Sequence, residues 1–307
     1  MRSTSTRRTP SRIPALPALV AVVLIAAACG SAASSPSAAP SPTPADGSTE
    51  PVAGFRLRVT TVQALPPREL FTWTPTILIT DDRVAVQGGA IPLIFPGPLV
   101  TPLLGTPLTE DAWAKIVAEA RAAGLLSGES DFTGGVLPPG AAAERLQMVV
   151  DGRTYDMTGD PNRVTFCGDV PCQADPATPA AFATFLSLLG NLPGWIGDGV
   201  GAPSPWTPSA YALLVGPPPP DEQNLAAAPL PWPFSDGAAE FGKPLTGEPD
   251  VRCGTVEGAE AAAFAAVLGN ATQLTTWRDP DVASPIGLTV RPLLPGDEDS
   301  CAPLVGG

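Results

Sequence analysis

The sequence of 307 residues contains no histidine. This absence excludes Ser-His-Asp and Cys-His catalytic arrangements, HExxH zinc sites and proton transfer by imidazole. Basic side chains are also few, with 17 Lys and Arg against 30 Asp and Glu and a net charge of −13. Because binding to nucleic acid needs clustered Lys and Arg, this composition argues against a nucleic-acid partner.

Long hydrophobic runs without interruption are scarce. Residues 13–28 are largely apolar but shorter than the about 20 residues of a comfortable transmembrane helix. Residues 91–104 are also apolar but contain four prolines. The chain has 40 prolines in all, which predicts few helices and many loops. Its hydrophobic content of 44% nevertheless excludes disorder throughout.

The first 28 residues have the pattern of a secretory signal peptide. Four arginines and no acidic residue precede the apolar stretch 13–28, and Ala26, Ala27 and Ala28 lead directly to Cys29. The segment from Ile25 to Cys29 resembles the lipobox of bacterial lipoproteins, although its aliphatic residue stands one place early and Ala26 occupies the usual leucine position.

The resemblance implies that residues 1–28 are removed and that Cys29 receives the lipid that attaches the chain to the membrane. The location would then be the extracytoplasmic face of the cell membrane. Several acyl chains on one cysteine suffice for stable attachment. The alternative is an ordinary cleaved signal that happens to precede a cysteine. In either case four positive charges leave with the signal, so the mature chain is more acidic still.

Residues 29–51 follow as a segment rich in Pro, Ser and Ala without a large apolar side chain. Such a composition cannot offset the entropy of ordering, so we expect a disordered tether. In an extended conformation of about 3.1 Å per residue, the 20 residues 31–50 would reach roughly 60 Å.

The body is expected to be α+β, with a first subdomain at residues 52–192, a linker at 193–205 and a second subdomain at 206–307. Alternating or apolar runs predict strands at Phe55–Val62, 76–80, 83–87, 146–150, 153–157, 211–215, 274–278 and 286–291. Asp151-Gly152 between two such runs is a strong signal for a β-hairpin with a type I′ turn.

Three helices are predicted from capping residues and apolar spacing. We expect them to begin after Thr109, Thr178 and Thr255 and to end at Gly124, Gly190 and Gly269. The expected buried stripes are Trp113, Ile116, Val117 and Ala120 in the first helix, Phe182, Phe185, Leu186 and Leu189 in the second, and Val256, Ala259, Ala263, Phe264 and Val267 in the third. The order of elements predicts a mostly antiparallel sheet with about three amphipathic helices packed on it, and it allows two related halves.

Four cysteines remain after Cys29, and an even number in an exported chain predicts disulfides. Three pairings are possible. The short turn between Cys167 and Cys172 favours that pair, which leaves Cys253 with Cys301. A redox role for Cys167 and Cys172 is the alternative, but neither a CxxC motif nor a thioredoxin-like setting supports it. A zinc site is disfavoured by the spacing and by the absence of histidine.

The sequence contains no cofactor-binding motif and no established metal-binding motif. Without histidine, paired carboxylates remain the available catalytic chemistry, as in glycoside hydrolysis. The candidates are Glu110, Asp111, Glu119, Glu129, Asp131, Glu144, Asp236 and Glu240. The acidic run Asp297-Glu298-Asp299 offers oxygen ligands for calcium, but a solvated loop is the simpler expectation.

Two proline-rich segments allow alternative interpretations. Pro217–Pro220 and the segment 230–234 are either polyproline ligands for a partner or a stiff crossover whose Trp232 and Phe234 fill the core. We favour the crossover.

Scattered segments of the body at 82–84, 95–98, 123–126, 150–154 and 290–295 resemble uncharacterised secreted lipoproteins of high-GC Gram-positive bacteria. This resemblance implies a location and no mechanism. We therefore expect a membrane-anchored, non-catalytic binding or interaction module for an unknown envelope ligand or protein. The alternative is a carboxylate-dependent hydrolase of envelope or extracellular glycans.

Overall fold

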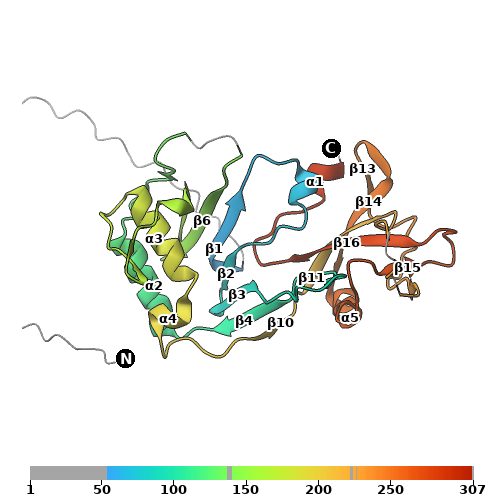
Figure 1. Ribbon diagram of the computed structural model, residues 1–307, viewed down its shortest axis with the longest axis horizontal. Coiled ribbons are helices and arrows are strands. Elements are labelled where there is room, and N and C mark those ends of the chain that lie inside the picture. The colour runs from blue at the N-terminus through green and yellow to red at the C-terminus, as the bar shows by residue number, and fades with distance from the viewer. Residues whose placement is uncertain (1–53, 137–139, 222–223, 226, 306–307) are drawn as a thin grey trace, which may run out of the picture. The chain divides into compact units, whose positions relative to one another are not determined.

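The computed structural model describes residues 54–136, 140–221, 224–225 and 227–305. The predicted signal peptide, Cys29 and the predicted tether lie outside the described residues. The described part of the chain belongs to one compact unit and contains two mostly antiparallel sheets with three helices of seven or more residues (Figure 1). The expected α+β fold is confirmed.

The first sheet has eight strands in the order β10-β4-β3-β2-β1-β6-β7-β5. Its strands are β1 (Phe55–Val62), β2 (Ile77–Thr80), β3 (Val84–Gly88), β4 (Leu103–Pro107), β5 (Asp131–Phe132), β6 (Ala143–Val150), β7 (Arg153–Gly159) and β10 (Ser204–Trp206). The predicted hairpin between β6 and β7 is present. Asp151 and Gly152 have φ angles of 52° and 73°, the two positive values that a type I′ turn requires.

Helices cover one face of this sheet. They are α2 (Glu110–Ala122), α3 (Pro179–Leu189) and the short α4 (Leu192–Ile196). Thr109 and Thr178 cap the first two as predicted, accepting hydrogen bonds from the backbone N–H of Ala112 and Ala181. The core beneath them contains Leu57 and Val59 of β1 and most of the predicted helical stripes, whereas Val117 and Leu186 are only partly buried.

The second sheet has six strands in the order β12-β15-β16-β11-β14-β13. They are β11 (Ala210–Gly216), β12 (Leu230–Pro231), β13 (Lys243–Leu245), β14 (Glu248–Glu257), β15 (Thr276–Arg278) and β16 (Ile286–Leu293). One face packs against α5 (Gly258–Leu268), and Trp232 and Phe234 fill the same core, as the crossover interpretation expected. The two sheets have different strand orders.

The opposite face of the second sheet carries a smaller core. Phe71, which follows the short helix α1 (Pro67–Leu70), packs there with Leu304 of α6 (Ala302–Val305) and with the Cys253–Cys301 disulfide. The second disulfide joins Cys167 to Cys172 across the small hairpin of β8 (Phe166–Cys167) and β9 (Val170–Pro171), close to the 3-10 helix η1 (Pro161–Arg163). Both predicted pairings are therefore present.

The start of the third helix was predicted wrongly. Thr255 and Val256 belong to β14, where they pair with Ala212 and Tyr211 of β11, and the helix begins only at Gly258. Strand pairing thus overrides the apparent cap. Within this helix Ala261 and Phe264 are buried, Val267 is partly buried, and the expected core positions Ala259 and Ala263 are exposed.

Other predicted boundaries also shift. The expected strand 274–278 is reduced to β15, and the expected linker 193–205 supplies most of α4 and part of β10. In the described part of the chain, no helix is long and apolar enough to cross a membrane.

Candidate functional site

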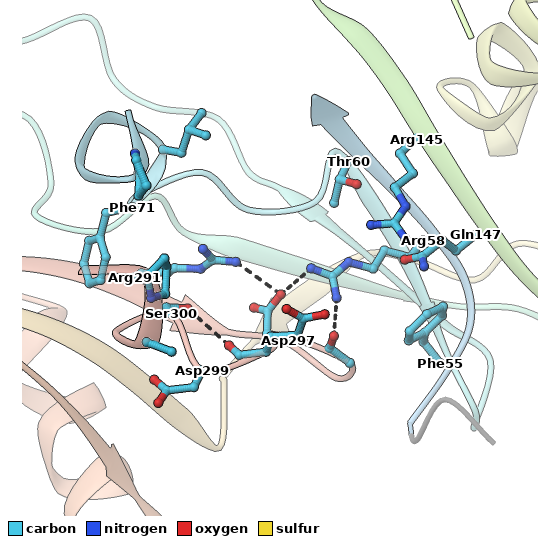
Figure 2. Close-up of a pocket in the computed structure, with 16 residues that line it drawn as sticks. Phe55, Arg58, Thr60, Phe71, Arg145, Gln147, Arg291, Asp297, Asp299 and Ser300 are labelled. Atoms are coloured by element: carbon cyan, nitrogen blue, oxygen red, sulfur yellow. Dashed lines mark hydrogen bonds and ion pairs between the residues drawn. The ribbon is translucent and has the colours of Figure 1, made fainter. Parts of the chain in front are cut away.

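A cleft of about 810 Å³ lies between the face of the first sheet that the helices do not cover and the chain that follows β16 (Figure 2). Polar side chains reach it from β1, β6 and β16, and apolar residues close it near α1 and α6. The lining residues are Phe55, Arg58, Thr60, Pro67, Leu70, Phe71, Arg145, Gln147, Arg291, Gly296, Asp297, Glu298, Asp299, Ser300, Ala302 and Pro303.

The strand alternation of β1 determines which side chains face this cleft. Leu57 and Val59 point into the helix-covered core, so Arg58 and Thr60 lie on the other face. On the neighbouring strand β6, Gln147 and Arg145 stand directly opposite Arg58 and Thr60. Two adjacent strands therefore present four polar side chains side by side.

Two arginines from different sheets meet at one carboxylate. Oδ1 of Asp297 accepts hydrogen bonds from Nη2 of Arg58 and, at 3.2 Å, from Nη2 of Arg291. The other carboxylate oxygen accepts the backbone N–H of Leu294 at 2.9 Å. The side chains of Arg58, Arg291 and Asp297 are only 12%, 16% and 2% exposed, so the cluster is largely shielded from water.

Gly296 allows the chain to approach β1 closely. Its φ is +79°, and a Cβ atom at this position would lie 2.3 Å from Cε1 of Phe55. Its carbonyl oxygen accepts a hydrogen bond of 2.5 Å from Nη1 of Arg58. A larger residue would therefore be strained in its backbone and would displace the segment that carries Asp297.

The cluster has two positive groups and one negative group. A guanidinium keeps its charge in a protein, so Arg58, Arg291 and Asp297 together carry one excess positive charge. The Nε atoms of both arginines are buried and have no hydrogen-bond partner in the described structure. Burial of an unbalanced charge is unfavourable unless a further partner is supplied.

A third arginine in the lining is already paired. Arg145 donates to Asp156 from Nε at 2.8 Å and from Nη2 at 2.5 Å, and Gln147 donates to the same carboxylate at 3.1 Å. The hydrogen bond from Arg145 is the main cause of the lowered pKa of Asp156. This pair is much more exposed than the Asp297 cluster, with side-chain exposures of 46% and 40%.

A smaller pocket of about 300 Å³ lies between the first sheet and α3. Glu144 of β6 lines it, and Oε1 accepts a hydrogen bond of 2.8 Å from Thr61, the residue opposite on β1. The second carboxylate oxygen is buried without a partner among the described residues. Burial raises the pKa of Glu144, and the bond from Thr61 opposes this shift.

Glu144 is the one candidate carboxylate that combines a cavity with a raised pKa among the described residues. Of the described residues that line its pocket, no other is acidic. The arrangement thus supplies one proton-transfer group where glycoside hydrolysis uses two.

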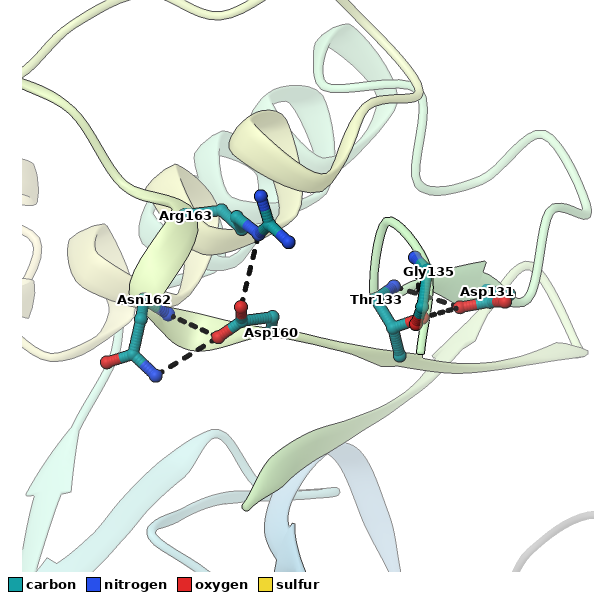
Figure 3. A network of polar contacts seen from close by, with 6 residues as sticks. All are labelled: Asp131, Thr133, Gly135, Asp160, Asn162 and Arg163. Carbon is teal, nitrogen blue, oxygen red and sulfur yellow. Dashed lines mark hydrogen bonds and ion pairs between the residues drawn. The ribbon is translucent and has the colours of Figure 1, made fainter. Parts of the chain in front are cut away.

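Two other acidic residues have structural partners (Figure 3). Hydrogen bonds from the N–H and hydroxyl of Thr133 lower the pKa of Asp131, and the N–H of Asn162 lowers that of Asp160. Arg163 also donates to Asp160 at 3.1 Å. Both carboxylates therefore stabilise turns in their charged form.

The remaining candidates are placed as follows. Glu110 forms an ion pair of 2.9 Å with Arg83, and Asp111 and Glu119 lie on α2. Glu129 accepts the backbone N–H groups of Ser130 and Asp131. Asp236 and Glu240 are exposed residues of the loop between β12 and β13.

The acidic run 297–299 differs from the solvated loop that we expected. Asp297 is buried between two arginines, and Asp299 accepts the backbone N–H of Cys301 at 2.9 Å. Across the described ranges no group of three or more His, Cys, Asp or Glu side chains is arranged to hold a metal ion.

Sequence reasoning missed Arg58, Arg291 and Gly296. For Arg58 the available signal was its place beside Arg56 at alternate positions of an otherwise largely apolar strand, which does not separate the two arginines, and no local pattern marks Arg291 or Gly296. Comparison of the chain with family models, curated proteins and solved structures finds no match.

Proposed function

We propose that this protein is a non-catalytic, lipid-anchored binding module at the extracytoplasmic face of the membrane, with the cleft around Arg58, Arg291 and Asp297 as its ligand-binding site. The observation that supports this proposal is the cluster itself. It fixes charged hydrogen-bond donors at the wall of a cleft that also has apolar walls. Cavities of 300–1,000 Å³ with a few placed polar groups are typical of small-ligand sites.

The binding function is tested by a thermal-shift screen on the purified, oxidised full-length protein. A ligand present at about 100 times its Kd stabilises the folded state by about 2.7 kcal/mol, enough to raise the melting temperature by several degrees. A cooperative transition that no small molecule shifts would contradict the proposed small-ligand function.

The anchor is tested separately through Cys29. A Cys29→Ser variant should lose metabolic lipid labelling and move from the membrane fraction to the soluble extracytoplasmic fraction. The control is Cys167→Ser, which removes one cysteine of the Cys167–Cys172 disulfide and should leave lipid labelling unchanged. A Cys29→Ser protein that remains membrane-bound would show that lipid on this residue is not the attachment.

Glycan hydrolysis is the second candidate, and the raised pKa of Glu144 is the observation in its favour. Hydrolysis that depends on this group should be abolished by Glu144→Gln. Thr61→Val, which removes the hydrogen-bond donor but keeps the carboxyl, should retain activity with a shifted pH profile. Release of reducing ends from wall and extracellular glycans measures both effects.

A further inference from the structure

We propose that the cleft binds an organic anion, with a carboxylate or phosphate head held by Arg291 and Arg58 and an apolar body lying along the rest of the cleft. This inference rests on the proposed binding function, because it assigns a ligand class to the same cleft. The assignment is based on charge, on unused donors and on the size of the cavity.

The charge of the cluster calls for a further anion. Arg58 and Arg291 share the single carboxylate of Asp297, and neither guanidinium can lose its proton. Glu298 and Asp299 also line the cleft, but both are exposed: Glu298 acts electrostatically on Arg145, Asp299 accepts the backbone N–H of Cys301, and neither forms an ion pair with Arg58 or Arg291 among the described residues. A bound oxyanion would balance the excess charge in the place where water screens it least.

The arginines also retain donor capacity. Within the described ranges Arg291 forms one hydrogen bond, from Nη2 to Asp297, whereas Arg58 uses both terminal nitrogens, one toward Asp297 and one toward the Gly296 carbonyl. Figure 2 shows the two guanidinium groups approaching Asp297 from opposite sides, with Thr60 and Arg145 on the neighbouring strands. The planar fork of arginine matches carboxylate and phosphate oxygens, so the free end of Arg291 is the principal donor.

The size of the cleft indicates a ligand larger than an inorganic ion. Its volume of about 810 Å³ far exceeds that of phosphate alone, and Pro67, Leu70, Phe71 and Pro303 form apolar walls. Burial of a hydrocarbon body against such walls adds affinity in proportion to the apolar area removed from water. We therefore expect an amphiphilic anion to bind more tightly than inorganic phosphate.

The experiment measures binding of five probes to the purified full-length protein by calorimetry and thermal shift. The probes are octanoate, octyl phosphate, octylammonium, octanol and inorganic phosphate. Octanoate or octyl phosphate should bind, with inorganic phosphate at least tenfold weaker and the cation and the alcohol weaker still. Comparison of octanoate with octyl phosphate distinguishes the two head groups.

The variants locate the head group. Arg291→Gln leaves the Arg58–Asp297 pair in place and should weaken anion binding at least tenfold, the effect of losing a charge-assisted hydrogen bond. Arg291→Lys keeps the charge without the fork and should restore part of the affinity. Arg121→Gln, at an exposed ion pair with Asp151, is the matched control and should bind as the unmodified protein does.

Each other outcome overturns the inference in a recognisable way. Equal binding of octanol or octylammonium that Arg291→Gln does not change would refute the anion while leaving a binding cleft. Anion binding that is insensitive to both Arg291 variants would place the head group elsewhere. No binding of any of the five probes by the folded protein would contradict the anion proposal, whereas the proposed binding function would be contradicted only if the wider thermal-shift screen also found no ligand.

Discussion

Replacement of Asp297 by Asn tests the electrostatic description of the cleft. The substitution keeps the shape and one acceptor oxygen of the side chain but removes its negative charge. Arg58 and Arg291 would then stand next to each other, largely buried, without a carboxylate. The backbone N–H of Leu294 would also lose its charged acceptor.

The expected loss of stability is large. Removal of one member of a buried ion pair costs about 3–5 kcal/mol, because it leaves an uncompensated charge. Since Asn retains an acceptor for one arginine, we expect the lower end, about 3 kcal/mol. For a body of this size, that loss lowers the melting temperature by about 6–12 °C.

The matched control is Asp156→Asn, which breaks the exposed pair with Arg145 on the same sheet face. Exposed pairs contribute about 0–1 kcal/mol, so this variant should unfold close to the unmodified protein. Urea unfolding at pH 7, followed by tryptophan fluorescence with disulfides intact, gives both free energies. The loss of unfolding free energy for Asp297→Asn must clearly exceed that for Asp156→Asn. An Asp297→Asn loss below about 1 kcal/mol would mean that water reaches and screens the cluster.

Three further changes have defined outcomes. Burial raises the pKa of Glu144, so the folded state binds the carboxyl proton more tightly than the unfolded state does, and the free energy of unfolding falls as pH rises from the ordinary carboxyl pKa through the raised one. The Glu144→Gln variant should lack this fall and should be more stable than the unmodified protein at pH 7. Urea unfolding midpoints at pH 4 and pH 7 measure both effects. The Cys167–Cys172 disulfide, with Cys167 exposed and Cys172 partly buried, should be reduced at a lower dithiothreitol concentration than the buried Cys253–Cys301 disulfide, as measured by alkylation and mass spectrometry. Loss of Cys253–Cys301, which joins residues 48 apart, should cost about 4 kcal/mol. Gly159→Ala would place a Cβ 2.4 Å from Cδ1 of Phe182 and should destabilise the first core by about 1–3 kcal/mol in thermal unfolding.

Each of these expectations has a contradicting result. Parallel pH profiles of the unmodified protein and Glu144→Gln would show that the carboxyl is well solvated. Simultaneous reduction of both disulfides would show that opening of the body controls access to each. An unchanged melting temperature for Gly159→Ala would mean that α3 moves away from β7 without loss.

Elements whose cause is local could be predicted from the sequence. The Asp151-Gly152 turn and the Thr109 and Thr178 caps depend on neighbours within a few residues, and all three are present as predicted. Thr255 has the same composition signal, but hydrogen bonding to β11 holds its backbone in a strand. A local pattern cannot reveal that a distant strand competes for the same residues.

The candidate site illustrates the same limit more strongly. The sequence identified Glu144 as one of eight carboxylates, but only the fold shows the apolar surroundings that raise its pKa. Arg58 looked like an ordinary polar position of an amphipathic strand, and Asp297 like part of a solvated acidic run. The contact between Arg58 and Asp297 depends on the path by which the C-terminal segment returns to β1. The spacing of residues along the sequence does not specify that path.

The contact between Arg58 and Asp297 also has a consequence for the order of folding. These residues are 239 positions apart, and a chain exported from its N-terminus, as we propose, delivers Arg58 early and Asp297 near the end. With delivery in that order, Arg58 would have no access to Asp297 until almost the whole chain had followed, and their contact would then close a long loop at an entropic cost. A chain truncated by its last dozen residues would retain both arginines and lack the carboxylate between them. Such a chain would also lack Cys301, so Cys253 would lose its disulfide partner in the same step.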